Sequence, residues 1–378
     1  VLYKSLISNR LKMCAVKLLL LMLYCITVCN SIKLASLDKT YEKGVQAYTK
    51  ERWTECILQF EESLHLYKLY KSIIINCRLK CRSHNLKPSI KENIEDLHIF
   101  EMFFNTKNCL TSCHNQGFKD VQLHANVSYE ILDNLQARRP YEYLHLCYFQ
   151  MYSLPKAASA AYTYYVANPH EEAMKANVEY YVQQPEVDPN EVIDLESEDY
   201  KILYRLGIKA YNQNKWGETI ASLEEALNGY LTWENSCRAE CERLPEQEWS
   251  PEFAKTISNY MASLLLCRQK CQDELKPQYN SGVEFLADVL NYLQISYYHL
   301  DKIKDAAKTV SSYLKLMPTD EDMLHNKEIY ETIVDKDAFK GRPDIEYYLK
   351  RDTYEKKLLN FFLHENDNTA HSNTNEVL

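Results

Sequence analysis

The second half of this chain repeats the first, and this internal repeat is the strongest constraint on its fold. The segment 41–81 recurs as 204–241, and a second pair of matching segments follows at 143–181 and 292–330. Repeats of this length indicate supersecondary units that bury their apolar faces against their neighbours. The first match pairs Tyr41, Gly44, Ala47, Tyr48 and Trp53 with Tyr204, Gly207, Ala210, Tyr211 and Trp216.

Apolar residues in the repeated segments recur at intervals of three and four, which is the period of an amphipathic α-helix. In the first copy, one such face begins at Tyr41, and a second face begins at Trp53 after a turn at 50–52. Two helices joined by a short turn, with glycine or another small residue where they cross, are typical of tetratricopeptide (TPR) hairpins. We therefore predict an all-α fold of two tandem TPR-like helical modules.

The boundaries of the modules follow from composition and from the ends of the matches. Module 1 is predicted at 38–182 and module 2 at 200–334, with a linker rich in proline and acidic residues at 183–199. After a proline- and glycine-containing break, an amphipathic C-terminal helix is expected at 344–364. The polar tail 365–378 has few apolar residues and is expected to be disordered.

The N-terminal residues have the pattern of a signal peptide. The chain begins with valine, and we take Met13 as the start of translation. A lysine then precedes the apolar run Leu18–Cys29, which is too short to span a bilayer. We expect residues 1–31 to be a signal peptide; the alternative is an N-terminal core helix. No later run is long and apolar enough for a membrane span.

Cysteines are numerous and regularly spaced, which favours an oxidising compartment. Of the 13 cysteines, eight form four Cys-x-x-x-Cys pairs, and two such pairs fall in each module. Cysteines four apart share a helix face, so two antiparallel helices would bring the first cysteine of one pair to the second of the other. This arrangement predicts the disulfides Cys77–Cys113, Cys81–Cys109, Cys237–Cys271 and Cys241–Cys267.

Two other uses of these cysteines remain open. A bridge within one helix has poor geometry, and a tetrathiolate zinc site would place its ligands in the middle of helices rather than in tight knuckles. Cys56 and Cys147 belong to no pair, and their counterparts in module 2 are Thr219 and Ser296. Their joint absence from module 2 suggests a fifth bridge, and two buried free thiols are the alternative.

No motif for catalysis, cofactor binding or metal binding is apparent in the sequence. Glycine-rich phosphate-binding loops and a nucleophile elbow are missing, and we expect neither catalytic residues nor a cofactor. The net charge of −9 argues against nucleic acid as a partner. Asn126 begins the sequon Asn126-Val127-Ser128 and is a candidate for glycosylation.

Tyrosine is unusually frequent, with 30 residues. Several, such as Tyr162 and Tyr165, lie on predicted helices. The simpler interpretation is a core at helix crossings whose hydroxyls reach the surface. The functional alternative is an aromatic groove for polyproline-II segments, because flat rings pack well against proline.

The four cysteine pairs, together with three further segments, make the chain resemble the leprecan family. The segments are Tyr204–Trp216, Tyr141–Tyr181 and the stretch Arg342-Pro343-Asp344-Ile345. The similarity extends over nearly all of 38–363. It implies an endoplasmic-reticulum protein that acts on procollagen. The longer members are prolyl 3-hydroxylases, which append an Fe(II)/2-oxoglutarate dioxygenase domain, and the shorter members lack that domain.

The sequence ends soon after Arg342 without room for a dioxygenase domain. The resemblance therefore implies a non-catalytic helper whose partners are a prolyl 3-hydroxylase, cyclophilin B and procollagen. It implies location in the endoplasmic-reticulum lumen, with some secretion to the extracellular matrix. Two alternatives remain: a paralogue that supports collagen lysyl hydroxylation, and an N-terminal fragment of a prolyl 3-hydroxylase.

Overall fold

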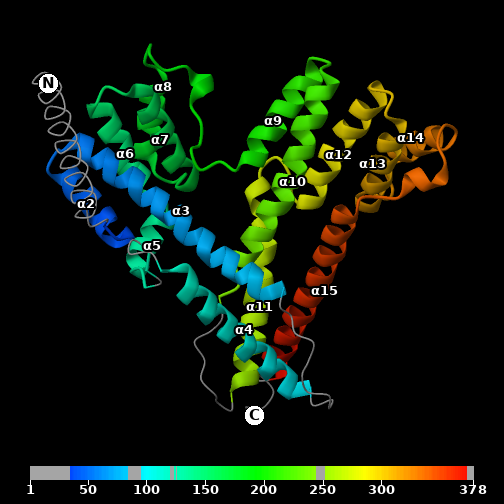
Figure 1. The fold of residues 1–378 in the computed structure, drawn as a ribbon, viewed down its shortest axis with the longest axis horizontal. Coiled ribbons are helices and arrows are strands. Elements are labelled where there is room, and N and C mark those ends of the chain that lie inside the picture. Colours follow the sequence, from blue (N-terminus) through cyan, green and yellow to red (C-terminus); the bar gives the residue numbers. More distant parts are fainter. Residues whose placement is uncertain (1–34, 84–94, 120–122, 125, 244–251, 373–378) are drawn as a thin grey trace, which may run out of the picture. The chain divides into compact units, whose positions relative to one another are not determined.

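A computed structural model shows a helical protein (Figure 1). It describes residues 35–83, 95–119, 123–124, 126–243 and 252–372, and no strand occurs among them. The predicted signal peptide at 1–31 lies outside these residues. The chain divides into two compact units: unit 1 comprises 1–73 and 113–194, and unit 2 comprises 74–112 and 195–378.

Unit 1 is built on helical hairpins around one hydrophobic core. Its core residues include Tyr41, Phe60, Leu144 and Tyr164. Glycine is needed at position 44, because an added Cβ would lie 2.9 Å from the Phe60 ring. The helices are α2 (Leu37–Thr49), α3 (Trp53–Ser83), α5 (Tyr129–Gln136), α6 (Arg139–Gln150), α7 (Leu154–Ala167) and α8 (Glu172–Val182). Helix α3 continues into unit 2 after residue 73, and most of α4 (Glu95–Gly117) belongs to unit 2.

Unit 2 repeats the hairpin arrangement and adds a long C-terminal helix. Its main core includes Tyr230, Leu290 and Tyr348, and a smaller cluster around Val310 lies between α13 and α14. The helices are α9 (Asp199–Asn212), α10 (Trp216–Glu240), α11 (Phe253–Lys270), α12 (Gly282–His299), α13 (Ile303–Leu316), α14 (Glu321–Glu331) and α15 (Pro343–Ser372).

The turns inside equivalent hairpins share one backbone device. Glu51 and Asn214 have φ values of 55° and 57°, and Tyr152 and Asp301 have values of 56° and 58°. Each residue reverses the chain between two helices through the left-handed region, which non-glycine residues adopt only as isolated residues. The repeat seen in the sequence is therefore also a repeat of backbone conformation, and the predicted all-α, TPR-like fold is confirmed.

The unit boundaries differ from the predicted modules, because 74–112 groups with unit 2. Nη1 of Arg78 donates hydrogen bonds of 3.1 and 2.8 Å to the carbonyl oxygens of Ala239 and Glu240, at the end of α10. These contacts join residues far apart in sequence, so module boundaries taken from continuous stretches of sequence cannot show them. The C-terminal helix α15 also continues to Ser372, past the expected end at 364, and 373–378 lies outside the described residues.

The predicted linker at 183–199 contains the short 3₁₀ helix η1 (Pro189–Glu191) and packs in part onto unit 1. Val187 is buried and belongs to that unit's core. Nη1 of Arg138 lies 3.0 Å from the Asp194 carboxylate, so at least one acidic residue of this segment forms an ion pair with unit 1.

Buried charges attach α15 to the rest of unit 2. Arg238 on α10 is 1% exposed and bonds both Glu234 on its own helix and Glu355 on α15. Arg268 on α11 lies 2.9 Å from Glu355 and 2.5 Å from Glu242. Each buried charge faces an opposite charge, which offsets its loss of hydration.

Candidate functional site

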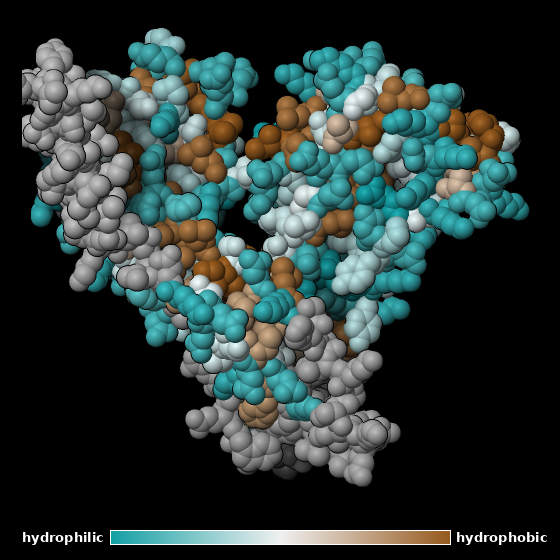
Figure 2. Space-filling model, viewed as in Figure 1, coloured by the Kyte–Doolittle hydropathy of each residue, from teal (hydrophilic) through white to brown (hydrophobic). Residues whose placement is uncertain are grey.

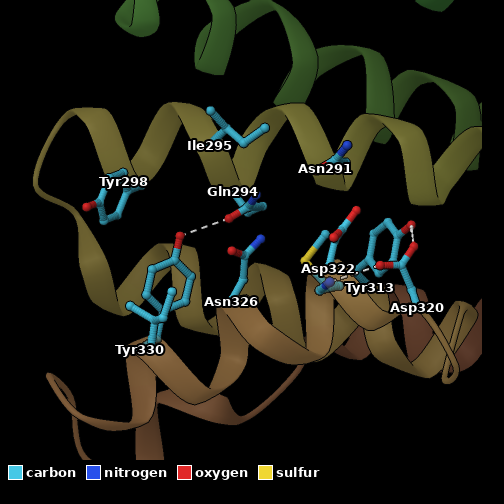
Figure 3. A pocket seen from close by; sticks show the side chains of 11 residues that line it. Asn291, Gln294, Ile295, Tyr298, Tyr313, Asp320, Asp322, Asn326 and Tyr330 are labelled. Carbon is cyan, nitrogen blue, oxygen red and sulfur yellow. Dashed lines mark hydrogen bonds between the residues drawn. The ribbon is translucent and has the colours of Figure 1, made fainter.

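A pocket of about 560 Å³ lies in unit 2 between α12, α13 and α14 (Figure 3). Helices α12 and α14 run in the same direction along its two sides, as the order of the labelled residues shows. In stacked helical hairpins such a face is concave and remains open to ligands. Its lining consists of Asn291, Gln294, Ile295, Tyr298, Tyr313, Asp320, Asp322, Met323, Asn326, Ile329 and Tyr330.

The middle of the pocket is lined by side-chain amides. Gln294 on α12 is 3% exposed, and its Oε1 accepts a hydrogen bond of 2.9 Å from the hydroxyl of Tyr330 on α14. Asn326 points from α14 toward Gln294 (Figure 3). The described residues provide no hydrogen-bond partner for Nε2 of Gln294 or for the amides of Asn291 and Asn326. These amides can therefore bind a ligand.

One end of the pocket is acidic. Asp320 caps α14 by accepting a hydrogen bond from the backbone N–H of Met323 at 2.9 Å, and its second oxygen accepts one from Tyr313 at 2.9 Å. Asp322 follows in the first turn of α14 and is exposed. Among the described residues that line the pocket none is basic, so the carboxylates give this end a negative potential.

The opposite end is apolar and aromatic. Tyr298 is 49% exposed, and its ring centre lies 6.0 Å from that of Tyr330. Ile329 is 40% exposed beside them. Hydrophobic residues also reach the surface around α13 and α14 (brown, upper right in Figure 2), where Leu324 is 40% and Ile333 is 56% exposed.

Two phenols of the pocket, those of Tyr313 and Tyr330, are held in the protonated form. Burial, together with the hydrogen bond to Asp320, raises the pKa of Tyr313 to about 12. Burial, with Tyr298 nearby, raises the pKa of Tyr330 to about 12. At neutral pH both are hydrogen-bonding groups and not bases, and with the amides they provide a surface that can form hydrogen bonds to a ligand.

The equivalent place in unit 1 keeps the geometry but changes the chemistry. His145 replaces Gln294, and its Nδ1 lies 3.0 Å from the hydroxyl of Tyr181, the counterpart of Tyr330. Phe149 and Tyr180 replace Tyr298 and Ile329, and their ring centres lie 6.4 Å apart. Rings thus occupy in unit 1 the positions at the apolar end of the pocket in unit 2.

The structure brings the predicted cysteines together in crossed pairs. Sulfur–sulfur bonds join Cys81 to Cys109, Cys237 to Cys271 and Cys241 to Cys267, the same partners as in the prediction. Cys77 and Cys113 are also disulfide-bonded. Peptide mapping under non-reducing conditions is the direct test of these pairs.

The remaining pair, Cys56 and Cys147, forms a disulfide between α3 and α6 of unit 1, with a Cα–Cα distance of 6.4 Å. The sequence left a bridge and two free thiols open. The bridge is buried where two helices cross, and the equivalent crossing in unit 2 has Thr219 and Ser296, which are both fully buried.

The other predicted residues lie away from the pocket. Asn126 is exposed just before α5, so its side chain is open to modification. Tyr162 and Tyr165 lie on α7 and are half-buried, and Tyr165 packs against the core of unit 1. This position favours the core interpretation for Tyr165.

Sequence reasoning missed the pocket, although a weak signal was present. Asn326 matches Asn177 in the repeat, and a glutamine interrupts the apolar face of 285–297 at Gln294. Among the described residues no group of three or more His, Cys, Asp or Glu could hold a metal ion. Within the same residues, no helix is both long and apolar enough to cross a bilayer.

Comparison with known proteins identifies the family of the repeat region. The family described as the leprecan family TPR-like repeat region matches residues 36–334. Cartilage-associated protein of Mus musculus is 30% identical over 338 residues, which are 87% of this chain and 84% of that protein. The human cartilage-associated protein gives the same identity over 339 residues and the same coverage.

Prolyl 3-hydroxylases match the same region at similar identity. Prolyl 3-hydroxylase 1 of Gallus gallus is 29% identical over 339 residues, which are 86% of this chain but 46% of that protein. The chain thus spans about half the length of this relative. With 36–334 matched by the family model and 30% identity to cartilage-associated protein, the chain belongs to the leprecan family.

Proposed function

We propose that this chain is a non-catalytic helper subunit of a collagen prolyl 3-hydroxylation complex, which assists the modification and folding of procollagen. The proposal rests mainly on one observation: the TPR-like region at 36–334 makes up most of this chain and is shared by cartilage-associated protein and prolyl 3-hydroxylases. Stacked helical repeats bind partners with the faces that they do not bury in stacking.

The chemistry of the pocket in unit 2 is suited to binding a ligand. Its lining consists of amides, phenols, two aspartates and apolar side chains, which offer hydrogen bonds, negative charge and apolar contacts. Disulfides within both units support an oxidising environment, in agreement with the proposed location in the endoplasmic-reticulum lumen.

Affinity purification of the tagged chain from a secretory-pathway lysate, followed by mass spectrometry, tests the partners. We expect a prolyl 3-hydroxylase and cyclophilin B to be recovered in stoichiometric amounts, with procollagen in smaller amounts. Recovery of a lysyl hydroxylase in place of the prolyl 3-hydroxylase would contradict the proposal and favour the paralogue.

A second candidate is that the chain is the N-terminal region of a prolyl 3-hydroxylase. The similar identity to prolyl 3-hydroxylase 1, over 46% of that protein, favours it. Transcript sequence beyond Leu378 separates the two candidates, because only the enzyme would continue into a dioxygenase reading frame. The purified chain 1–378 should show no 2-oxoglutarate turnover with Fe(II) and a procollagen peptide; turnover that a chelator abolishes would refute the helper role.

A further inference from the structure

The pocket between α12 and α14 has the features of a binding site for an extended peptide. A side chain that is held in place and has an unused donor is the first feature. Gln294 is 3% exposed, Tyr330 fixes its Oε1, and its Nε2 has no partner among the described residues. Nε2 is not among the side-chain atoms that are both buried and unpartnered, so it is accessible in the pocket and can donate a hydrogen bond to a ligand.

Asn291 and Asn326 extend the same chemistry along the groove. Each amide offers both a donor and an acceptor, which is the pattern that a peptide bond also presents. An extended chain exposes its N–H and C=O groups because it makes no internal hydrogen bonds. Side-chain amides arranged along α12 and α14 therefore match the backbone of an extended peptide and leave its side chains to be selected at the two ends.

The two ends of the groove select different side chains. Asp322 makes no ion pair with another described residue and lies at the end where Asp320 caps α14, so this end favours a cation. Tyr298 and Ile329 at the other end favour an apolar group. The unit 1 site is a contrast within the same molecule, because it replaces Asp322 with Ala173 and fills its apolar end with rings.

The length of the groove fixes the spacing of the two side chains. Asn291 and Tyr298 are separated by two turns of α12, which corresponds to about 10 Å. An extended chain advances about 3 Å per residue, so the side chains that reach the two ends are about three positions apart in the peptide.

We propose that the groove between α12 and α14 binds an extended peptide segment with a basic side chain at the Asp322 end and an apolar side chain at the Tyr298 end. Gln294, Asn291 and Asn326 hold the backbone between them. The site belongs to the chain itself, so it does not depend on whether the hydroxylase complex forms.

The test uses the full chain and a fluorescein-labelled, amidated decapeptide of glycine and proline with one lysine three positions before one leucine. Fluorescence anisotropy should show saturable binding with a Kd below about 1 mM. A peptide with glutamine in place of the lysine should bind about threefold to tenfold more weakly. Equal binding of the two peptides, or no saturation, would overturn the proposal.

Neighbouring acids on α14 supply a matched pair of variants. Asp322 and Glu321 are both exposed in the first turn of α14, but only Asp322 lines the pocket. Asp322→Asn should weaken binding of the lysine peptide about threefold to tenfold, and Glu321→Gln should change it less than twofold. Equal effects of the two variants would contradict recognition in the groove.

A variant that does not alter charge tests the hydrogen bonds from the amides to the peptide backbone. Asn326→Ala should weaken both peptides by the same factor, because it removes hydrogen bonds to the backbone and leaves Asp322 in place. Its circular dichroism and melting temperature should match those of the parent chain, since Asn326 makes no hydrogen bond in the described structure. Unchanged peptide binding by this variant would show that the amides do not hold the peptide.

Self-association that Asp322→Asn abolishes would show instead that a second copy of the chain fills the groove, which would also overturn the proposal.

Discussion

Nη1 of Arg342 lies 2.8 and 2.6 Å from the two carboxylate oxygens of Glu224, which joins the start of α15 to α10. The same guanidinium reaches Asp344 at 3.0 Å, and the hydroxyl of Tyr297 donates to Glu224 at 2.9 Å. Arg342 belongs to one of the three segments on which, with the cysteine pairs, the resemblance to the family rested. Its role in the fold is to hold the C-terminal helix on unit 2.

Replacing Arg342 with alanine should destabilise unit 2. The arginine and glutamate side chains are 16% and 27% exposed, so the variant leaves the half-buried Glu224 with the Tyr297 hydroxyl but without its ion-pair partner. We expect a loss of about 2 kcal/mol in the free energy of unfolding, measured by guanidinium denaturation. Arg139→Ala is the control, because the Arg139–Glu142 pair is 46% and 38% exposed and should contribute less than about 1 kcal/mol. Equal losses in the two variants would show that the less exposed Arg342–Glu224 pair contributes no more than an exposed one.

Asp344, which also contacts Arg342, makes the stability of unit 2 depend on pH. Burial tends to raise its pKa, but hydrogen bonds and charge from Arg342 outweigh burial and lower the pKa below the ordinary value. A lowered carboxyl pKa stabilises the fold above about pH 4 and loses this contribution as the pH falls through the lowered value. Asp344→Asn should therefore flatten the acid limb of the stability curve, and an unaltered limb would contradict this assignment.

His145→Gln should remove a pH dependence from unit 1. Burial lowers the pKa of His145 to about 4, so between about pH 6.5 and 4 the unfolded chain binds a proton that the folded chain does not. Stability therefore falls as the pH falls through this window, by about 2 kcal/mol between pH 7 and 5.

Glutamine is the matched replacement because unit 2 already uses Gln294 to accept a hydrogen bond from Tyr330. The variant should keep the hydrogen bond to Tyr181 and lose the extra acid sensitivity. The measurement is the free energy of unfolding of both proteins at pH 7, 6 and 5. Parallel curves for the two proteins would show that His145 does not titrate differently on folding.

The double substitution Cys56→Thr, Cys147→Ser puts into unit 1 the residues that unit 2 carries at the same helix crossing. The disulfide closes a sequence separation of 91 residues, and its loss releases entropy to the unfolded chain. We expect the free energy of unfolding to fall by about 4 kcal/mol. A change below about 1 kcal/mol would mean that small residues alone secure this crossing. Urea denaturation without reductant gives the answer and leaves the other disulfides intact.

Gly282→Ala should destabilise unit 2, because a methyl group at this position would overlap the phenol oxygens of Tyr230 and Tyr348. Overpacking of this kind costs about 1–3 kcal/mol. Removing one oxygen with Tyr348→Phe should recover part of the loss in the double variant. Gly217→Ala is the control, since nothing lies within 4 Å of its added Cβ and alanine favours the helix. Thermal unfolding distinguishes the variants, and an unchanged melting temperature for Gly282→Ala would contradict the crowding.

The local part of this fold could be predicted from sequence. The spacing of Tyr41, Gly44 and Tyr48 indicated a helix with a close crossing, and the structure places Gly44 against Phe60. Helical periodicity depends only on residues close together in the chain, so it can be recognised in a single sequence. The crossed partners of Cys237 and Cys241 followed from the same periodicity once two antiparallel helices were assumed.

Contacts between distant segments were decided by the tertiary structure. The sequence placed Gln294 and Tyr330 on separate helices, and packing of α14 beside α12 made them one site with an unused donor. In the same way, the sequence left open whether Cys56 and Cys147 form a bridge or remain free thiols, because the answer depends on how α3 crosses α6. The sequence by itself determined the helices, the repeat and the family. The pocket came from side chains that only long-range packing brings together.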